Sequence, residues 1–414
     1  MARLSMALPL LLFTLSGVVA LIYQVSWTRM LYPAFGMQLS AITAVVATFL
    51  AGLGLGSRLF GPMADRTNPW KLYAGLEIGI GLWGLAMPSL TGAAVWVLPS
   101  LGSSQLVRVA GAAVLLVVPC MLMGGTFPAF ARGYRRESTS LGRDLGLLYA
   151  LNTIGGAIGC MAAGNWLLPH YAMDSIVWGG ALANFAIGLG ILKLAPGYEQ
   201  GSPSRLDSVR EEPPGDGLLL GVLFLTGWLS LSYELLWTRA LTQVLMATTA
   251  SYSLALSALL LGITLGSFLY RRLLAGRDSP GLLTWMTLLL TVSAATSFLL
   301  LPWLSSIHLS LTTALGGTFW PSLGLSLLAF APTATLFGAT FPLCLERMSR
   351  EGGLGARLGL AYAVNTLGSV LGAVVTGIYA LDWLASGGTL LALLGLSLVM
   401  VGLAFQLDEP GPSR

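Results

Sequence analysis

Charged residues are scarce in this sequence. Asp, Glu, Lys and Arg make up 9% of the 414 residues, whereas hydrophobic residues make up 55%. Since about a quarter of a soluble protein is charged, the composition excludes a soluble globular domain. At about 20 apolar residues per spanning helix, the hydrophobic runs fill most of the chain with about a dozen spans. We therefore expect an all-α polytopic membrane protein without a large extramembrane catalytic domain.

Cysteine and histidine are also rare. Cys120, Cys160 and Cys344 lie in or at the ends of apolar runs, and His170 and His308 are far apart in the sequence. The cysteines lack metal-ligand spacing, so we expect them to be small packing residues. The sequence thus predicts no metal cluster and no cofactor, and it gives no sign of a nucleic-acid partner.

The apolar runs fall into two sets of six, which predicts twelve transmembrane helices in contact with the lipid bilayer. The first six are 6–32, 37–59, 70–90, 106–130, 145–168 and 176–194. The second six are 218–241, 250–270, 282–304, 323–343, 358–381 and 389–405. The first run is too long for the apolar region of a signal peptide, so we interpret it as a retained span.

Basic residues favour one orientation. If the N-terminus is cytoplasmic, all of the 21 Lys and Arg residues except Arg29, Arg108 and Arg239 fall in cytoplasmic segments. Positive charge near span ends marks the cytoplasmic side. We therefore expect a multi-pass protein of the cell (inner) membrane with both termini in the cytoplasm.

The two halves of the chain repeat each other. SGVVALIYQVSWTRML at Ser16 is matched by TGWLSLSYELLWTRAL at Thr226, and three further blocks recur in the same order. These further pairs are 52–59 with 262–269, 124–128 (GGTFP) with 338–342 (GATFP), and 145–164 with 358–377. Such a pattern indicates duplication of a six-helix unit.

Because each unit has an even number of spans, the two copies run parallel, as the two halves of major facilitator transporters do. The predicted domains are a six-helix bundle at 1–194, a cytoplasmic linker at 195–216 and a second bundle at 217–414. Between the second and third spans, Gly61, Asp65 and Arg66 partly match the major facilitator loop motif. This segment is either a cytoplasmic gating loop, in which Asp65 meets a helix N-terminus and neighbouring arginines, or an ordinary anchored turn.

The repeated blocks also resemble a particular family. YQVSWTR and YELLWTR, the Gly-x-Thr-Phe-Pro blocks and the Tyr-Ala-x-Asn-Thr-x-Gly blocks are similar to the membrane portion of bacterial spermidine-synthase-like polytopic proteins. Those proteins are described as fusions of a major facilitator-like region with an aminopropyltransferase-like domain. This sequence has no soluble domain of that kind, so we expect no enzyme activity from the chain alone. A separate soluble or membrane protein partner would have to supply it.

Glu234 is the sharpest candidate for a functional charge. It lies within an apolar span, where a charge costs about 2.5–3.5 kcal/mol, and its counterpart in the first half is the neutral Gln24. It either binds an amine or a proton during transport, together with Gln24, Tyr23 and Tyr233, or forms a buried ion pair with a nearby arginine.

Glu77 is a second intramembrane acid, whose counterpart is Thr287. It is either a second protonatable group or an acid bonded to a neighbouring helix. Asp174 and Asp382 lie at extracytoplasmic span ends, where a carboxylate can reach water.

Arg29 and Arg239 follow the tryptophans of the repeated block. Aromatic rings with arginine at a span end are typical of the membrane interface. These arginines therefore either anchor the first and seventh spans or, if those spans are longer, lie deeper and bind an anion.

Four further polar residues recur in the halves: Asn152, Asn365, Thr126 and Thr340. The asparagines either hold helix interfaces, as the nearby glycines suggest, or face a substrate. The threonines either bond backbone carbonyls freed by the following prolines or line a cavity. By resemblance to major facilitator proteins, the first, fourth, seventh and tenth spans face the central cavity.

The sequence thus predicts a major facilitator-like secondary transporter of a small organic solute, which the resemblance suggests is a polyamine or another organic cation. The alternative is a non-transporting scaffold subunit that docks a partner enzyme or membrane complex.

Overall fold

The computed structural model describes residues 2–35, 39–101, 105–134, 141–194, 216–277, 279–348 and 353–409, and within these ranges it holds helices and no strand. The predicted linker at 195–216 lies outside them except for Asp216, where α8 begins. In the first half the helices are α1 (Ala2–Phe35), α2 (Leu39–Arg66), α3 (Pro69–Leu101), α4 (Gln105–Tyr134), α5 (Leu141–Ala162), α6 (Leu168–His170) and α7 (Met173–Leu194). In the second half they are α8 (Asp216–Leu245), α9 (Thr249–Leu269), α10 (Leu282–Ser297), α11 (Leu304–Leu315), α12 (Phe319–Met348), α13 (Leu354–Val374), α14 (Leu381–Trp383) and α15 (Ala385–Asp408).

Twelve spans are long and apolar enough to cross a membrane in the described part of the chain, as the sequence predicts. Helices form here because a backbone surrounded by lipid must satisfy its own hydrogen bonds.

Three spans are interrupted. α5 continues into α6 through a π-helical turn at Ala163–Leu167, and α13 continues into α14 through one at Val375–Ala380. A 3₁₀ turn, Phe298–Trp303, joins α10 to α11.

The two halves that repeat in sequence also pack their helices in the same way. α2 packs on α4 as α9 packs on α12, and α1 packs on α5 as α8 packs on α13. A glycine permits the same close approach in both copies: a Cβ at Gly17 would collide with the backbone carbonyl of Asn152, and one at Gly227 with that of Asn365. These crossings are of the small-residue type that membrane helices favour.

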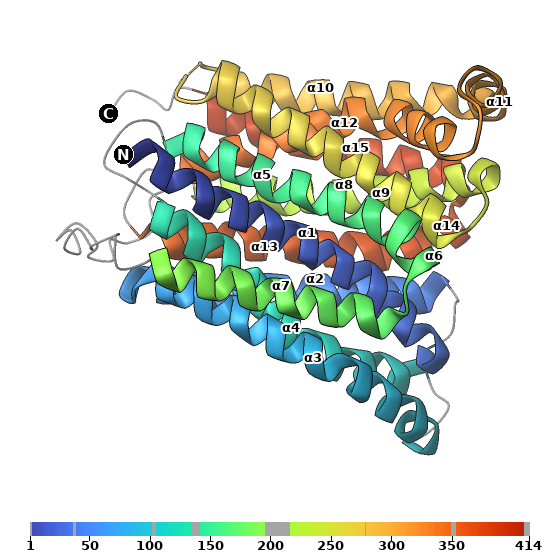
Figure 1. Cartoon of the computed structure of the whole chain (residues 1–414). Helices are drawn as coiled ribbons and strands as arrows, with labels where there is room; N and C mark the ends of the chain where they lie inside the picture. The colour runs from blue at the N-terminus through green and yellow to red at the C-terminus, as the bar shows by residue number, and fades with distance from the viewer. Residues whose placement is uncertain are drawn as a thin grey trace.

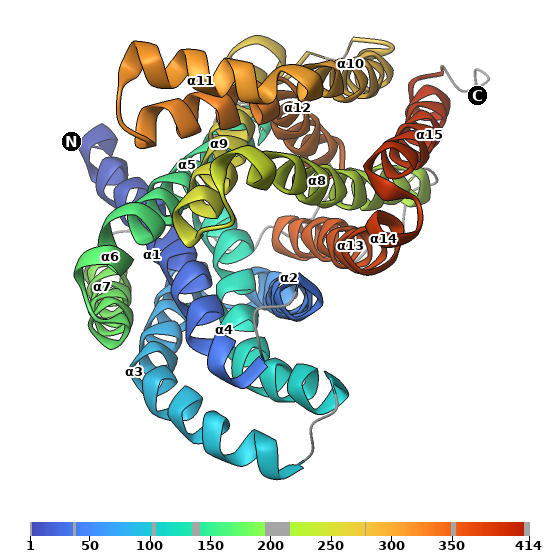
Figure 2. The ribbon, with the colours of Figure 1, turned by 90° about the vertical axis from the view of Figure 1, so that its right-hand side faces the viewer.

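The halves meet along two seams, α2 against α13 and α5 against α9. Figure 1 shows the spans side on: α1 begins and α15 ends at one end of the molecule, and α6, α11 and α14 lie at the other. We call these ends the terminal face and the opposite face. Viewed from the opposite face in Figure 2, α2 lies next to α13 and α5 next to α9.

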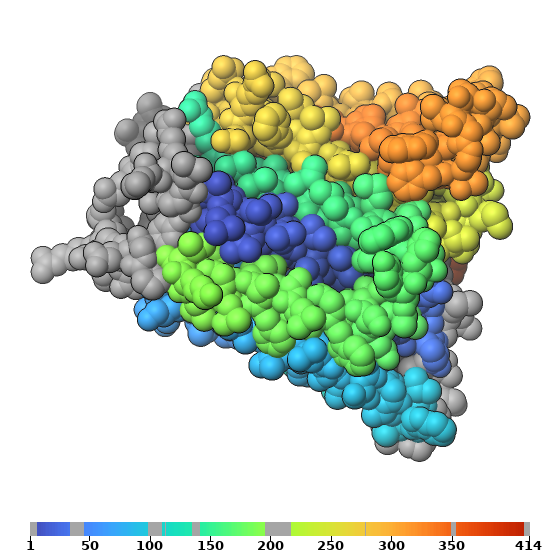
Figure 3. Space-filling view, viewed as in Figure 1, coloured from blue at the N-terminus to red at the C-terminus, as the bar shows by residue number. Residues whose placement is uncertain are grey.

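The molecule is wider at the opposite face, where α3 and α4 extend away from α10 and α11 (Figure 3). Several exposed tryptophans lie at helix ends on this face, in the manner of an interfacial aromatic belt. They are Trp96, Trp166, Trp303, Trp320 and Trp383.

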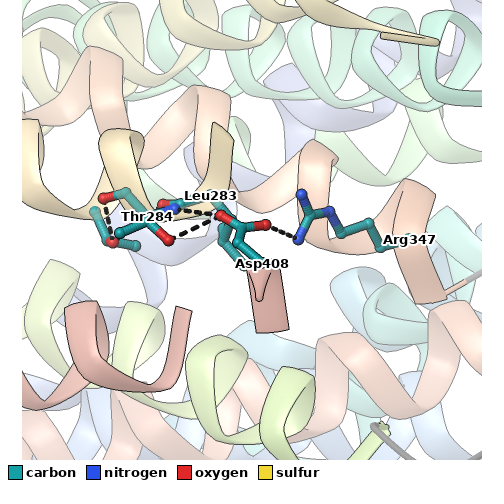
Figure 4. Close-up of polar contacts among 5 residues, drawn as sticks. Leu283, Thr284, Arg347 and Asp408 are labelled. Carbon is teal, nitrogen blue, oxygen red and sulfur yellow. Dashed lines mark hydrogen bonds and ion pairs between the residues drawn. The ribbon is translucent and has the colours of Figure 1, made fainter. Parts of the chain in front are cut away.

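The last helix is fastened at the terminal face through Asp408. Its carboxylate accepts hydrogen bonds from the backbone N–H (2.9 Å) and hydroxyl (2.8 Å) of Thr284 in the first turn of α10. It also forms an ion pair with Arg347 at the end of α12 (2.8 Å), as Figure 4 shows. One carboxylate thus ties three helices of the second half together.

Candidate functional site

Glu234 lies in α8, about three turns before the helix ends. Its side chain is only 9% exposed, and within the described ranges its carboxyl has no hydrogen-bond or ion-pair partner. It interacts electrostatically with Tyr252 of α9 and with Cys160 of α5, and Tyr252 in turn interacts with Tyr32 of α1. An unpaired carboxyl is therefore held between helices of both halves.

A small pocket, with room for about one water molecule, lies between α8 and α9 next to this site. Its polar lining consists of Thr238, Thr242, Ser251 and Tyr252, and the remaining lining is Leu241, Leu245 and Ala255. Thr238 is one turn beyond Glu234 on α8, and Tyr252 borders both the pocket and the carboxyl. The pocket thus lies near the opposite-face end of α8, and Tyr252 connects it to the surroundings of Glu234.

The structure does not gather all of the residues predicted to surround Glu234. Tyr23 is fully buried and stacks on Trp27, with ring centroids 4.5 Å apart. Its ring packs so closely on Gly84 and Gly180 that a Cβ at either glycine would collide with it. Tyr23 therefore points into the first half. Tyr233 lies in the second half beside Phe337 of α12 (6.4 Å). The physical reason is helical geometry: adjacent residues project about 100° apart, so Tyr233 and Glu234 face different neighbours. Gln24 is partly buried on α1.

Four aromatic rings close the interface between the halves on the terminal side of Glu234. Phe127 of α4 lies 4.7 Å from Tyr362 of α13, and Phe341 of α12 lies 4.9 Å from Tyr149 of α5 and 5.0 Å from Tyr362 (centroid distances). Each ring lies about two turns from the terminal-face end of its helix. We call these four residues the aromatic quartet.

The quartet is built from the repeat, since Phe127 and Phe341 belong to the two Thr-Phe-Pro blocks and Tyr149 and Tyr362 to the two Tyr-Ala-x-Asn blocks. Sequence reasoning singled out these blocks but selected their threonines and asparagines. The available signal was a large aromatic residue at the same level in both halves, on spans that face one another.

Asp65 fastens the seam between α2 and α13 at the terminal face. Its carboxylate accepts the backbone N–H groups of Gly355 (3.0 Å) and Ala356 (2.8 Å) in the first turn of α13, and pairs with Arg132 of α4 (3.0 Å). Gly61 lets α2 approach the Gly355 backbone closely, and Arg66 is exposed. A carboxylate at a helix N-terminus is favoured by the helix dipole. The structure thus places Asp65 against a helix N-terminus and an arginine, the two contacts considered for a gating loop.

Glu346 makes a related contact that sequence reasoning missed. In the repeat, Glu346 of α12 corresponds to Arg132 of α4. Its carboxylate accepts a hydrogen bond from the hydroxyl of Tyr270. The same carboxylate lies against Gly142 in the first turn of α5. Both seams therefore carry a carboxylate at the start of a helix from the other half. Aligning GGTFPAFAR with GATFPLCLE would have revealed the exchange of Arg for Glu.

Glu77 of α3 is fully buried within the first half. Its carboxyl accepts hydrogen bonds from Ser16 of α1 (2.6 Å) and Asn184 of α7 (2.7 Å). Of the two predicted alternatives, the contacts match an acid bonded to neighbouring helices.

The two arginines lie away from Glu234. Arg239 donates to the carbonyl of Leu381 (3.3 Å) and lies 4.0 Å from the exposed Asp382, at the opposite face. Arg29 is exposed on α1 near Tyr32. The expected alternative of an ion pair between Glu234 and a nearby arginine is wrong, because both guanidinium groups are at the rim rather than in the interior.

The repeated polar residues mostly bond within and between helices. Asn365 donates to the carbonyl of Leu223 on α8 (2.9 Å), whereas Asn152 lies against Gly17. Thr126 donates to the carbonyl of Met123 (2.6 Å) and Thr340 to that of Leu336 (2.8 Å).

Those carbonyls are not the ones that the prolines free. Pro342 leaves the carbonyl of Gly338, four residues earlier, without its helical partner. Ser267 of α9 donates to that carbonyl (2.8 Å). The predicted role of Thr340 is thus filled by a serine on the neighbouring helix.

Comparison with known proteins finds similarity in structure. No family model matches the chain, and no curated protein matches it. The human organic anion transporter MFSD10 (TETRAN) superposes with a TM-score of 0.61 and 15% identity over 95% of this chain and 98% of that one. A bacterial homologue of the iron transporter ferroportin, in an outward-facing state, gives 0.60 and 14% over 97% and 98%.

At these identities the likeness shows the fold. The chain is a polytopic membrane protein whose described residues form twelve spans in two parallel six-helix repeats, with the fold of major facilitator-type proteins.

Proposed function

We propose that the chain is a secondary transporter of a small organic solute, whose two six-helix halves alternate access to a central site at Glu234. The observation that carries this proposal is a buried, unpartnered carboxyl held between helices of both halves. On its terminal side the route is closed by the aromatic quartet. We further propose that the terminal face lies on the cytoplasmic side of the inner membrane, because the distribution of basic residues predicts that orientation.

The proposed substrate is a polyamine or another organic cation. A single carboxylate in a low-dielectric site attracts a cation strongly, and Tyr252 adds an aromatic group beside it. The resemblance to the membrane portion of spermidine-synthase-like proteins points to the same class. A separate synthase would then act on solute that the chain moves.

The test is uptake of radiolabelled spermidine, putrescine and a monoamine by proteoliposomes. Glu234→Gln removes the charge and keeps the shape, so uptake should fall at least tenfold. Asp174→Asn, at an exposed acid on α7, is the matched control and should leave uptake unchanged.

A charge swap makes the test sharper. Combining Glu234→Gln with Gln24→Glu moves the carboxyl to the equivalent position of α1, and the two-fold repeat predicts partial recovery of uptake. If no amine is taken up and the protein instead purifies with a stoichiometric partner, the scaffold alternative holds.

A further inference from the structure

A second cluster of polar side chains lies inside the first half, where α1, α3 and α7 meet. Ser16 Oγ donates to one oxygen of Glu77 (2.6 Å) and Asn184 Nδ2 to the other (2.7 Å). Tyr73, one turn before Glu77, and Tyr23 both interact electrostatically with the same carboxyl. Of these five side chains, only Glu77 can carry a negative charge at neutral pH.

Two oxygens of this cluster lack partners. Among the described residues, Asn184 Oδ1 and the hydroxyl of Tyr23 have no hydrogen bond, whereas the hydroxyl of Tyr73 lies within reach of Ser16 and Glu77. The side chains are buried: Glu77, Tyr73 and Tyr23 are 0% exposed and Asn184 is 2% exposed. Buried polar atoms without partners are costly and rare in native proteins. The site is therefore incomplete as a set of side chains alone.

The charge of the cluster is also unbalanced. No Lys, Arg or His of the described chain pairs with Glu77. An ionised carboxylate at this depth requires a positive partner or a proton.

The second half is an internal control for the packing. Thr226 and Thr287 occupy the places of Ser16 and Glu77, and both donate to backbone carbonyls of their own helices (2.7 and 3.0 Å). Thr226 also faces the sulfur of Met400 on α15. The same junction of three helices therefore forms with neutral, satisfied side chains. Packing of this kind of junction therefore does not by itself require an acid.

We propose that the Glu77 cluster binds a small monovalent cation, with Na⁺ as the best match. All of its potential ligands are oxygens, which hard cations prefer. One carboxylate balances a single positive charge, and Ser16 Oγ and Asn184 Oδ1 keep lone pairs free after their hydrogen bonds to Glu77. A proton would neutralise the carboxyl, but its single O–H could satisfy at most one of the two unpartnered oxygens.

The experiment uses the full chain in lipid nanodiscs. Binding of radiolabelled ²²Na⁺ is measured by equilibrium dialysis, and thermal unfolding is followed as NaCl replaces choline chloride at constant ionic strength. We expect about one saturable Na⁺ per chain and a matching rise in Tm, since a ligand that binds the native state stabilises it. KCl should give at most a tenth of the affinity.

Variants locate the site. Glu77→Gln should abolish ²²Na⁺ binding and the Tm rise, and Asn184→Ala should weaken binding at least tenfold. Glu234→Gln should retain both, which separates this cation site from the proposed solute site. The proposal is overturned if wild-type protein binds no ²²Na⁺ and melts at the same temperature in all three salts. It is equally overturned if binding is lost in Glu234→Gln and kept in Glu77→Gln.

Discussion

Phe127 of the first half and Tyr362 of the second half pack against each other at the interface between the halves, with ring centroids 4.7 Å apart and ring planes inclined by 41°. Both residues come from blocks that the two halves share, and the blocks' other copies supply Phe341 and Tyr149. Aromatic packing of this kind contributes about 0.5–1.5 kcal/mol per pair beyond buried area. In the proposed transporter, the terminal side of the route is therefore closed by a seal to which each half contributes equally.

Removing two rings of this seal should open the route from the terminal face. In a chain whose native cysteines are replaced, Glu234→Cys reports access to the central site. With Phe127→Ala and Tyr362→Ala, a membrane-impermeant thiol reagent applied from the terminal face should label it at least tenfold faster. Phe298→Ala, which removes a buried ring outside the seal, should not change the labelling rate. Equal rates in all three chains would show that the quartet is not the seal.

Asp65→Asn should weaken the closed terminal side. The change removes the ion pair with Arg132 and turns two charge-assisted hydrogen bonds at the start of α13 into weaker, neutral ones. We expect a loss of about 1 kcal/mol for the closed arrangement. The same labelling of Glu234→Cys should accelerate several-fold. Asp174→Asn serves as the control, and an unchanged rate with Asp65→Asn would contradict the assigned role.

Asp408→Ala should destabilise the second half. It leaves Arg347 without its partner and removes both hydrogen bonds from Thr284. The ion pair is only partly buried, so losing it together with two charge-assisted hydrogen bonds should lower the free energy of unfolding in mixed micelles by about 2 kcal/mol. Glu409→Ala, at the next and exposed position, should cost less than about 0.5 kcal/mol. Equal effects of the two substitutions would refute the clamp.

The two repeated asparagines should differ in their contributions to stability. Asn365 donates across to α8 (2.9 Å), and Asn152 has no such side-chain bond in the described chain. Hydrogen bonds between membrane helices are worth about 0.6 kcal/mol on average. Asn365→Ala should therefore lower the unfolding free energy by about that much more than Asn152→Ala. The same micelle titration measures both, and the reverse order would count against the asymmetry.

The fold was largely predictable because each span is a long apolar run and the repeat fixes how the halves relate. The π-helical turns at Ala163–Leu167 and Val375–Ala380 were not, since nothing in their composition distinguishes them from α-helix. The burial of Glu234 between polar neighbours also required the structure. Its electrostatic neighbours Cys160 and Tyr252 belong to α5 and α9, and a sequence repeat says which residues recur, not which helices cross.

The candidate site shows the same limit. Asp65 could be singled out because its loop motif is local in sequence, and it makes the two contacts considered there; its role in gating stays a prediction. Tyr23 and Tyr233 were misplaced because they adjoin Gln24 and Glu234 in sequence but face other helices. Glu346 escaped notice because it lies at a predicted span end, where a carboxylate draws no attention until Gly142 is seen beside it.

Alternation of the two halves is tested most directly by two distances measured on the same protein. Spin labels at Arg66 and Arg277 report the terminal face, and labels at Asp174 and Asp382 report the opposite face; all four positions are exposed. Double electron–electron resonance in nanodiscs should show the terminal pair moving apart and the opposite pair moving together when spermidine or another accepted amine is added. The Glu234→Gln chain should show no shift. One fixed distance for each pair, whatever amine is added, would contradict alternating access and identify a rigid scaffold.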